Sequence, residues 1–366
     1  MSPVERSVLD LPFDVAPDPD EFIRAAMEWH FDPRTGSPYW LRRAASLDFD
    51  PRRDVKSHAD LRLFPNVVNE LRDVPVTDLL PRGYGGTADI VGTFESGGTT
   101  GAPKRVLCLR DWMDRMLAWS TAKLDLHGFP RGAQWLGVTP SGPHIVGRIF
   151  EESATTHGSL GFHVDLDPRW VKKLIASGRK DLADDYAEHV IDQAAFILRT
   201  QDIGVMTITP PLLERLAHRD ELVDLVNEKV KAIRWGGTQM DADTRHLYRT
   251  EVFPGVRLYG HYGSTMILGI AGQRFDADDA DACVFDTLSP YVTFRVVDPA
   301  TGDPVPHGAR GQVVMNHVSK GLLLPNNLER DLATRVEAPA GHVGDSVQDI
   351  APVARFDDEA VIEGVY

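Results

Sequence analysis

The 366-residue sequence contains two cysteines, Cys108 and Cys283, and has no long run of apolar residues or of basic residues. Two cysteines cannot build a disulfide framework, and we expect both to fill space in the core rather than to act as nucleophiles. A membrane span needs about 20 consecutive apolar residues, so we expect no span, no signal peptide and a cytoplasmic protein. Nucleic acids are bound by clustered Lys and Arg, and the net charge is −15, so we expect no nucleic-acid partner.

The pattern of apolar residues indicates an α/β fold. With 42% hydrophobic residues the chain can bury a large core. Short apolar runs typical of strands alternate with segments of helical periodicity, which favours parallel sheets. The expected strands are 90–94, 135–139, 203–209, 230–235 and 256–259, and the expected helices include 18–29, 110–126 and 168–200, the last interrupted near Gly178. Ligands of open α/β sheets bind beyond the carboxyl ends of the strands, where the glycine-containing segments 236–237 and 260–263 lie.

The pattern of apolar and polar residues changes near residue 284. Residues 291–297 alternate between apolar and polar side chains, and 311–315 follow as a second strand after a turn at 299–304. This pattern is typical of antiparallel sheet. We therefore expect two units: 1–283, with α/β sheets, and 284–366, a smaller β subdomain.

Residues 96–104 (SGGTTGAPK) follow the expected strand 90–94. Glycines let successive backbone N–H groups turn toward one point, while the hydroxyls and Lys104 add donors around it, which suits a polyphosphate. The common P-loop does not fit, because Pro103 precedes the lysine and Arg105 follows it. The chain is expected to leave the loop as a strand. A plain surface turn is the alternative, although it would need neither the lysine nor this order of residues.

At these residues the sequence resembles the adenylate-forming superfamily of acyl-CoA ligases, adenylation domains and luciferases. The doubled glycine is most similar to the phenylacetate–CoA ligase and acyl-protein synthetase branches, and the size resembles short members associated with phenazine antibiotic pathways. The resemblance implies the large N-terminal domain of that fold, with two αβ sheet subdomains, a small antiparallel β-barrel subdomain and no C-terminal domain. It implies ATP and Mg²⁺ as cofactors. In this family the loop holds the outer phosphates, through residues Ser96, Gly97, Gly98, Thr99, Thr100, Gly101 and Lys104.

Two later motifs resemble the adenine site of the family. Residues 262–266 (YGSTM) match Tyr-Gly-x-Thr-Glu, which implies that Tyr262 stacks on adenine beside Gly263 and that Thr265 donates to the α-phosphate. The usual Mg²⁺-binding glutamate is Met266, and methionine is a poor ligand for a cation that prefers oxygen. Glu95 is a possible substitute, and a solvent-exposed Glu95 is the alternative. The metal ligand is therefore unknown.

The second adenine motif is 235–238 (WGGT), where the resemblance implies that the backbone of Gly236 and Gly237 lines adenine and where Thr238 replaces the usual glutamate. Residues 341–345 (GHVGD) resemble the segment whose aspartate binds the ribose hydroxyls, which assigns that role to Asp345. A solvated turn is the alternative.

His144 follows an expected strand, where the family often places a residue near the substrate carboxylate. A structural role for this histidine is equally compatible with the sequence. We group Lys104, Thr265 and His144 as catalytic candidates.

Residues 355–358 (RFDD) resemble the start of the family's hinge, but Lys320 is the last lysine and Cys283 the last cysteine. The usual C-terminal lysine and an acyl-accepting thiol are therefore not expected. The sequence favours ATP-dependent activation of a carboxylic acid, aromatic and from a natural-product pathway, to an acyl-adenylate. The product would pass to a partner such as a reductase. Two alternatives stay open: a nucleotide- or acyl-binding protein with impaired catalysis, and a ligase half that needs a separate C-terminal domain.

Overall fold

The computed structural model describes residues 7–97, 102–275, 283–353, 355–356 and 359–360. Its α-helices are α1 (Pro19–Phe31), α2 (Pro38–Arg43), α3 (Pro51–Asp54), α4 (Arg110–Leu126), α5 (Ile145–Thr156), α6 (Pro168–Ala176), α7 (Lys180–Thr200), α8 (Pro210–Ala217), α9 (Asp220–Lys229) and α10 (Ala242–Leu247). Short 3₁₀-helices are η1 (Val8–Asp10), η2 (Ala44–Ser46), η3 (His58–Leu63), η4 (Val68–Arg72), η5 (Val76–Leu79) and η6 (Arg82–Thr87), and η7 (Tyr248–Val252) is a π-helical turn.

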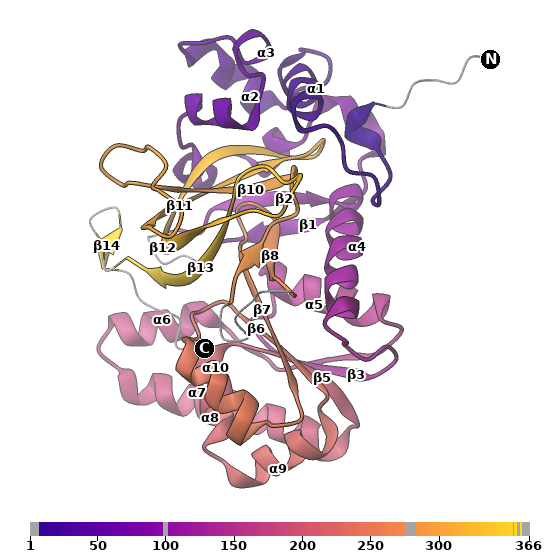
Figure 1. Ribbon diagram of the computed structural model, residues 1–366, viewed down its shortest axis with the longest axis vertical. Coiled ribbons are helices and arrows are strands. Elements are labelled where there is room, and N and C mark those ends of the chain that lie inside the picture. Colours follow the sequence, from indigo (N-terminus) through magenta and orange to yellow (C-terminus); the bar gives the residue numbers. More distant parts are fainter. Residues whose placement is uncertain (1–6, 98–101, 276–282, 354, 357–358, 361–366) are drawn as a thin grey trace, which may run out of the picture.

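The strands are β1 (Ile90–Glu95), β2 (Arg105–Leu109), β3 (Gln134–Val138), β4 (Gly161–His163), β5 (Ile203–Ile208), β6 (Ala232–Gly236), β7 (Arg257–Ser264), β8 (Gly269–Gln273), β9 (Phe285–Asp286), β10 (Val292–Val297), β11 (Arg310–Val318), β12 (Leu323–Glu337), β13 (Asp345–Pro352), β14 (Arg355–Phe356) and β15 (Glu359–Ala360). Eleven of them form one mixed sheet in the order β10-β11-β12-β13-β9-β8-β7-β6-β5-β3-β4 (Figure 1). The predicted α/β fold class is confirmed. The region before β3 contributes the separate two-stranded sheet β1–β2.

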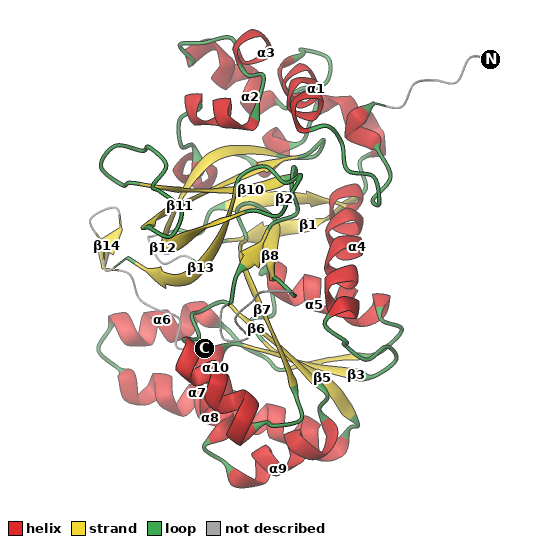
Figure 2. Cartoon of the chain, in the orientation of Figure 1, coloured by secondary structure: helices red, strands yellow, loops and turns green. Residues whose placement is uncertain are grey.

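The parallel half of the large sheet consists of β4, β3, β5, β6 and β7. Helices cover these strands in the lower part of the molecule (Figure 2). Every residue of β5 is buried, as expected for a strand with helices on both faces. The predicted interruption in the helical segment is confirmed, because Gly178, at φ +75°, separates α6 from α7. Because β4, β3, β5, β6 and β7 are parallel, their carboxyl ends lie together at one edge of this half.

The other half of the sheet is antiparallel and runs from β8 through β9 and β13 to β12, β11 and β10. Phe294 in β10 also pairs with Asp345 in β13, which curls these strands toward a closed barrel. The strands after residue 284 are thus antiparallel, as their alternating pattern predicts. The division of the chain into 1–283 and 284–366 stays a prediction, since β9 and β13 continue directly into the main sheet.

The N-terminal helices are anchored on the barrel strands. Asp18 caps α1 by accepting from the backbone N–H groups of Asp20 and Glu21, which confirms the predicted helix start. The indole of Trp29 donates to the carbonyl of Lys320 at 2.9 Å, and that of Trp40 donates to Leu323 at 2.8 Å. Both side chains thus hold the N-terminal region against residues near the start of β12.

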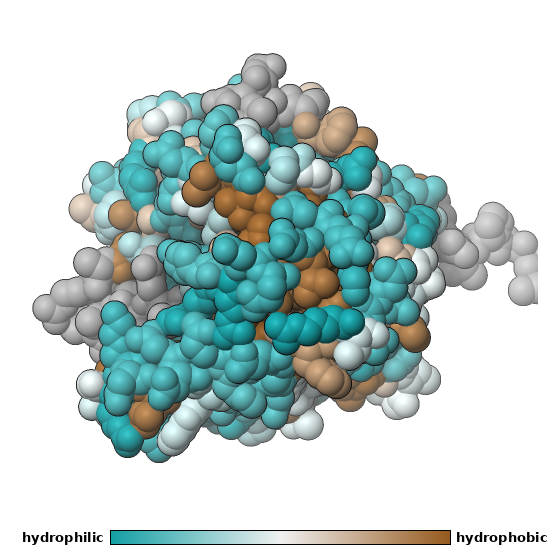
Figure 3. Space-filling view, turned by 90° about the horizontal axis from the view of Figure 1, so that it is seen from below, coloured by the Kyte–Doolittle hydropathy of each residue, from teal (hydrophilic) through white to brown (hydrophobic). Residues whose placement is uncertain are grey.

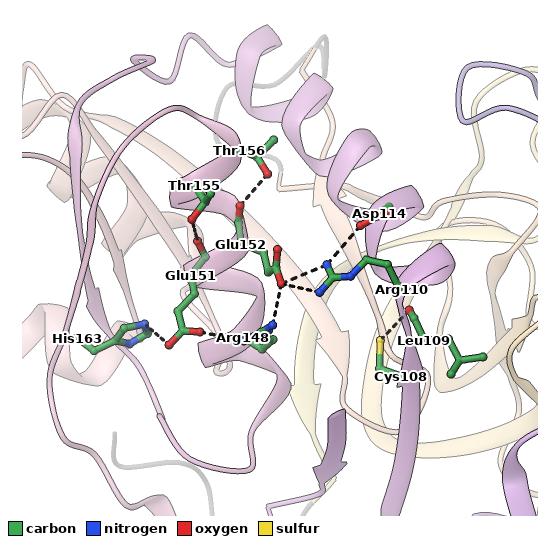
Figure 4. Close-up of polar contacts among 10 residues, drawn as sticks. All are labelled: Cys108, Leu109, Arg110, Asp114, Arg148, Glu151, Glu152, Thr155, Thr156 and His163. Atoms are coloured by element: carbon green, nitrogen blue, oxygen red, sulfur yellow. Dashed lines mark hydrogen bonds and ion pairs between the residues drawn. The ribbon is translucent and has the colours of Figure 1, made fainter. Parts of the chain in front are cut away.

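A network of charged side chains joins α4 to α5 (Figure 4). Arg110, at the start of α4, lies 3.2 Å from Glu152 of α5, and Arg148 lies 3.1 Å from the same carboxylate. Since β2 leads directly into α4, these contacts hold the end of β2 against α5.

Figure 3 shows the molecule from its lower end, where the surface is mainly hydrophilic and apolar side chains show between the polar ones. Among the described residues, no helix combines the length and the apolar character that crossing a membrane would require.

Candidate functional site

A cavity of about 430 Å³ lies where the carboxyl ends of the parallel strands face the barrel. Residues that follow or end β3, β5, β6 and β7 line one side of it, and residues of β12 and β13 line the other. The wall is completed by the start of α5, by one face of α6 and by Ser96, Gly97, Ala102 and Lys104. This is the location that open α/β sheets use for ligands, and the volume is in the range of small-molecule sites.

Most of the predicted site residues in the described part of the chain meet at this cavity. Those that line it are Ser96, Gly97, Lys104, His144, Gly236, Gly237, Tyr262, Gly263 and Thr265. Gly98, Thr99, Thr100 and Gly101 lie outside the described residues, as do positions 357–358 of the expected hinge. Segments separated by more than a hundred positions are thus brought to one cavity, and the roles assigned to them stay predictions.

The stem of the 96–104 loop is closed by two hydrogen bonds between its ends. The Ser96 N–H donates to the Lys104 carbonyl at 3.0 Å, and the Lys104 N–H donates to the Ser96 hydroxyl at 3.0 Å. The chain leaves the loop through β2, which confirms the expected strand. The paired ends of the loop, at the ends of β1 and β2, therefore lie at the cavity.

Positive charges gather around the two ends of the 96–104 loop. Lys172 of α6 donates to the Gly97 carbonyl at 3.2 Å, and Arg72 donates to the Ala102 carbonyl at 3.1 Å. Together with Lys104 and Arg330 of β12, these side chains line the cavity. Burial, followed by the nearby Arg330 and Arg169 charges, lowers the pKa of Lys172 to about 8. Such a cluster of cations suits a polyanion.

The two positions considered for Mg²⁺ do not fit a metal ion. Met266 lines the cavity and is buried, but its thioether is a soft ligand. Glu95 is neither free nor solvated, because Arg105 donates to it at 2.8 Å and Arg169 at 2.6 Å. Burial acts to raise the pKa of Glu95, yet the two guanidinium groups hold it below its usual range. The described residues contain no group of three or more His, Cys, Asp or Glu side chains placed to hold a metal ion.

Asp345 is not among the residues that line the cavity, and its expected role in binding ribose stays a prediction. It begins β13 and is 6% exposed. One carboxylate oxygen accepts from the Val296 N–H at 3.0 Å, and the other accepts from Arg335 at 2.8 Å. The Gly-Asp pair at 344–345 resembles the family segment, and these two contacts hold the Asp345 carboxylate inside the barrel.

A different carboxylate occupies the cavity wall beside the predicted adenine residue. Asp331 of β12 lines the cavity and accepts a hydrogen bond from the Tyr262 hydroxyl at 2.8 Å. Burial raises the pKa values of both groups. Glu329, also in the wall, accepts from Asn327 at 2.7 Å, and burial raises its pKa as well. We missed these residues in the sequence, although the charged triplet 329–331 between apolar residues of one strand was a usable signal.

The glycine pair after β6 is required by close packing. A Cβ on Gly236 would come within 2.6 Å of the His261 ring and its carbonyl oxygen, and Gly237 has φ +87°. His144, the residue before α5, is 8% exposed, and its pKa is lowered to about 4, first by burial and then by the Arg169 and Lys172 charges. It therefore lies in the wall as a neutral imidazole at neutral pH.

Arg234 is a further residue that the sequence analysis did not single out. It lines the inner part of the cavity from β6 and is 2% exposed. Its charge interrupts the otherwise apolar strand between Ile233 and Trp235. A charged residue within a buried strand was the sequence signal for it.

A scan against protein-family models matches residues 185–321 to the family of AMP-binding enzymes. That range contains the 235–238 and 262–266 motifs and does not contain the 96–104 loop. No curated protein sequence matches the chain.

The fold is similar to that of 2-hydroxyisobutyryl-CoA ligase solved with 2-HIB-AMP and CoA, with TM-score 0.61, 17% identity, and coverage of 94% of this chain and 70% of that one. The same ligase in its postadenylation state with R3-HIB-AMP gives TM-score 0.60 at 17% identity, with coverage of 94% and 69%. ATP-bound MatB from Rhodopseudomonas palustris gives TM-score 0.48 at 20% identity, with coverage of 72% of this chain. The chain spans 48% of the MatB chain and about 70% of the ligase chain.

Proposed function

We propose that this chain activates a carboxylic acid with ATP, forming an acyl-adenylate and releasing pyrophosphate. The observation that carries this proposal is the cavity, where Ser96, Gly97 and Lys104 of the loop meet the glycine pair 236–237 and the 262–265 segment. Arg72, Lys172 and Arg330 also line it. The match of 185–321 to AMP-binding enzymes and the fold shared with an acyl-CoA ligase support the same chemistry.

In this reaction a carboxylate oxygen attacks the α-phosphorus of ATP, and the bond from that phosphorus to the bridging oxygen of pyrophosphate breaks. The protein has to align the two reactants and offset the charge that moves to the leaving group. Lys104, Lys172 and Arg330 are suited to the outer phosphates, because they converge at the loop. Thr265 is proposed to donate to the α-phosphate.

The nucleoside is proposed to lie between β6, β7 and β12. Tyr262 would contact adenine, the backbone at 236–237 would line its edge, and Asp331 takes the ribose role that the sequence assigned to Asp345. A carboxylate accepts well from a diol, and Asp331 is the carboxylate hydrogen-bonded to Tyr262. We derive no step through Mg²⁺, since neither Met266 nor Glu95 suits it.

The finer features of the reaction are also proposals. Rings of His144, Trp235 and His261 line the cavity and support an aromatic acid. A phenylacetate–CoA ligase-like origin and a phenazine-type antibiotic pathway rest on the resemblance of the 96–104 loop alone. The acyl group is proposed to pass to a partner enzyme in the cytoplasm. Cys283 is no ready acceptor, because burial raises its pKa to about 12 and keeps it as a thiol.

The experiment is pyrophosphate release by the purified chain with ATP and a panel of aromatic and aliphatic acids, with mass spectrometry for acyl-AMP. Acid-dependent release is expected, and Lys104→Ala should lower it, while Lys173→Ala, on the exposed face of α6, should leave it unchanged. ATP binding without release under any acid would overturn the catalytic proposal. It would favour the binding protein suggested by Met266, or an activity that appears only with a partner chain.

A further inference from the structure

Arg234 is a buried cation that lacks a carboxylate partner among the described residues. The Ser153 hydroxyl lies 3.5 Å from a terminal guanidinium nitrogen of Arg234, and the guanidinium carbon lies 5.6 Å from the centre of the Trp135 ring. The Nε–H of Arg234 has no hydrogen-bond partner. A buried charge without a counter-ion is costly to the folded state, so its position in a cavity wall calls for a ligand.

The strand ends around Arg234 present further polar groups without partners. The hydroxyls of Thr139 and Thr209 are buried and make no hydrogen bond, and neither does Nδ1 of His261. All three residues line the same cavity, after β3, after β5 and on β7. Burial lowers the pKa of His261 to about 3, so this ring is neutral. The inner wall thus combines one positive charge with several neutral hydrogen-bonding groups.

Arg234 lies at the end of the cavity away from the phosphate loop. The length of α5 gives the separation. His144 precedes this helix, and the start of the loop lies beside it, because the Glu95 N–H donates to the Pro143 carbonyl at 2.8 Å. Ser153, the contact of Arg234, lies nine residues after His144 in the same helix, or about 14 Å along the axis. Arg234 is therefore out of reach of a polyphosphate held by the loop.

We propose that Arg234, with the hydroxyls of Thr139 and Thr209, binds a second carboxylate at the distal end of the acid substrate. The substrate is then a dicarboxylic acid, aliphatic or aromatic, of which only the other carboxylate reacts with the α-phosphorus of ATP. A guanidinium matches a carboxylate with two parallel N–H donors, and a buried site strengthens that pair. This inference rests on the proposed function and deepens it by naming the substrate class.

The test compares each diacid with the monoacid in which a methyl group replaces the second carboxylate. Succinate and butyrate, glutarate and pentanoate, adipate and hexanoate, and terephthalate and 4-methylbenzoate form such pairs. Binding to the purified full chain is measured by calorimetry, without and with AMP. At least one diacid is expected to bind about tenfold or more tightly than its methyl partner, as expected for a buried charge pair.

Variants assign that preference to the guanidinium. Arg234→Met should remove it, and Arg234→Lys, which keeps the charge but not the fork, should retain part of it. The matched control is Arg295→Met: Arg295 is a partly buried arginine that donates to Asn326 and does not line the cavity. This control should keep the full preference. Thr209→Val, a nearly isosteric change, gives a second test that leaves the buried charge in place and should weaken diacid binding alone.

Three results would overturn the proposal: no diacid binds, methyl partners bind as well as diacids, or Arg234→Met keeps the preference. Failure of the proposed function looks different. In that case ATP would give no acid-dependent pyrophosphate, while the diacid preference and its loss in Arg234→Met would remain.

Discussion

The Tyr262 hydroxyl donates to Asp331 at 2.8 Å and thereby joins β7 of the parallel half to β12 of the barrel. The two residues are 69 positions apart, and both line the cavity. One hydrogen bond therefore connects the adenine motif seen in the sequence with a carboxylate that no motif indicated. It also ties together two strands that line the cavity.

We expect Asp331→Asn to weaken the binding of AMP and of ATP equally, by about tenfold. The ribose is common to both nucleotides, and the amide is a weaker acceptor than a carboxylate. Competition binding with a fluorescent nucleotide measures both affinities. A variant that weakens ATP alone would move Asp331 from the ribose to the phosphates.

Asp345→Asn should lower the stability of the fold and leave nucleotide affinity nearly unchanged. Arg335 and the Val296 N–H lose their charged acceptor, so the free energy of unfolding should fall by about 1–3 kcal/mol. Nucleotide affinity should stay within about twofold, since the side chain is outside the cavity. Urea unfolding and the same competition assay separate the two effects, and a large loss of AMP affinity would restore Asp345 to the site.

Lys104→Ala should weaken the binding of ATP by about tenfold or more and the binding of AMP by less than about threefold, because the lost charge faces the outer phosphates. Arg105→Ala is the matched control, as the neighbouring Arg105 is exposed and pairs with Glu95. Isothermal titration of both nucleotides gives the comparison. Equal losses for ATP and AMP would place Lys104 away from the phosphates.

The affinity for ATP should fall as pH rises through about 8. Lys172 has its pKa lowered to about 8, so the free protein holds this cation below that pH and loses it above. In Lys172→Met the dependence in this window should disappear, whereas Lys173→Met, on the exposed side of the same helix, should retain it. Titrations with ATP between pH 7 and pH 9 measure the slope, and an unchanged slope in Lys172→Met would contradict the assignment.

Acid should destabilise the fold below pH 6.5. Burial lowers the pKa of His30 to about 4 and that of His317 to about 3. Between these values and 6.5 only the unfolded chain binds the protons, so stability is complete above 6.5 and falls as pH falls, by about 1.4 kcal/mol per pH unit for each histidine. Urea unfolding at several pH values measures this slope. His30→Gln should reduce the slope, and a variant of the exposed His218 should not.

Local patterns were sufficient for the elements of the fold. The β-branched run before the loop became β1, the Asp-Pro start became the cap of α1, and the periodic segment 110–126 became α4. Each of these depends on residues within one or two turns of each other, which a sequence shows directly. The same holds for the glycine pair at 236–237, which the sequence placed at the end of a strand and which lies at the end of β6.

The sequence by itself determined the α/β class, the loop between β1 and β2, and the segments that supply the cavity's predicted residues. Only the tertiary structure decided which charged groups face the cavity. A Gly-Asp pair looks the same whether its carboxylate meets a ligand or the Val296 N–H, and Asp345 is held inside the barrel by partners ten and 49 positions away. The side chains of Lys172, Arg234 and Asp331 line the cavity although no sequence motif marks them, because tertiary packing places them there. A side chain's partner is set by the packing of strands and helices distant in sequence, and burial then sets its charge.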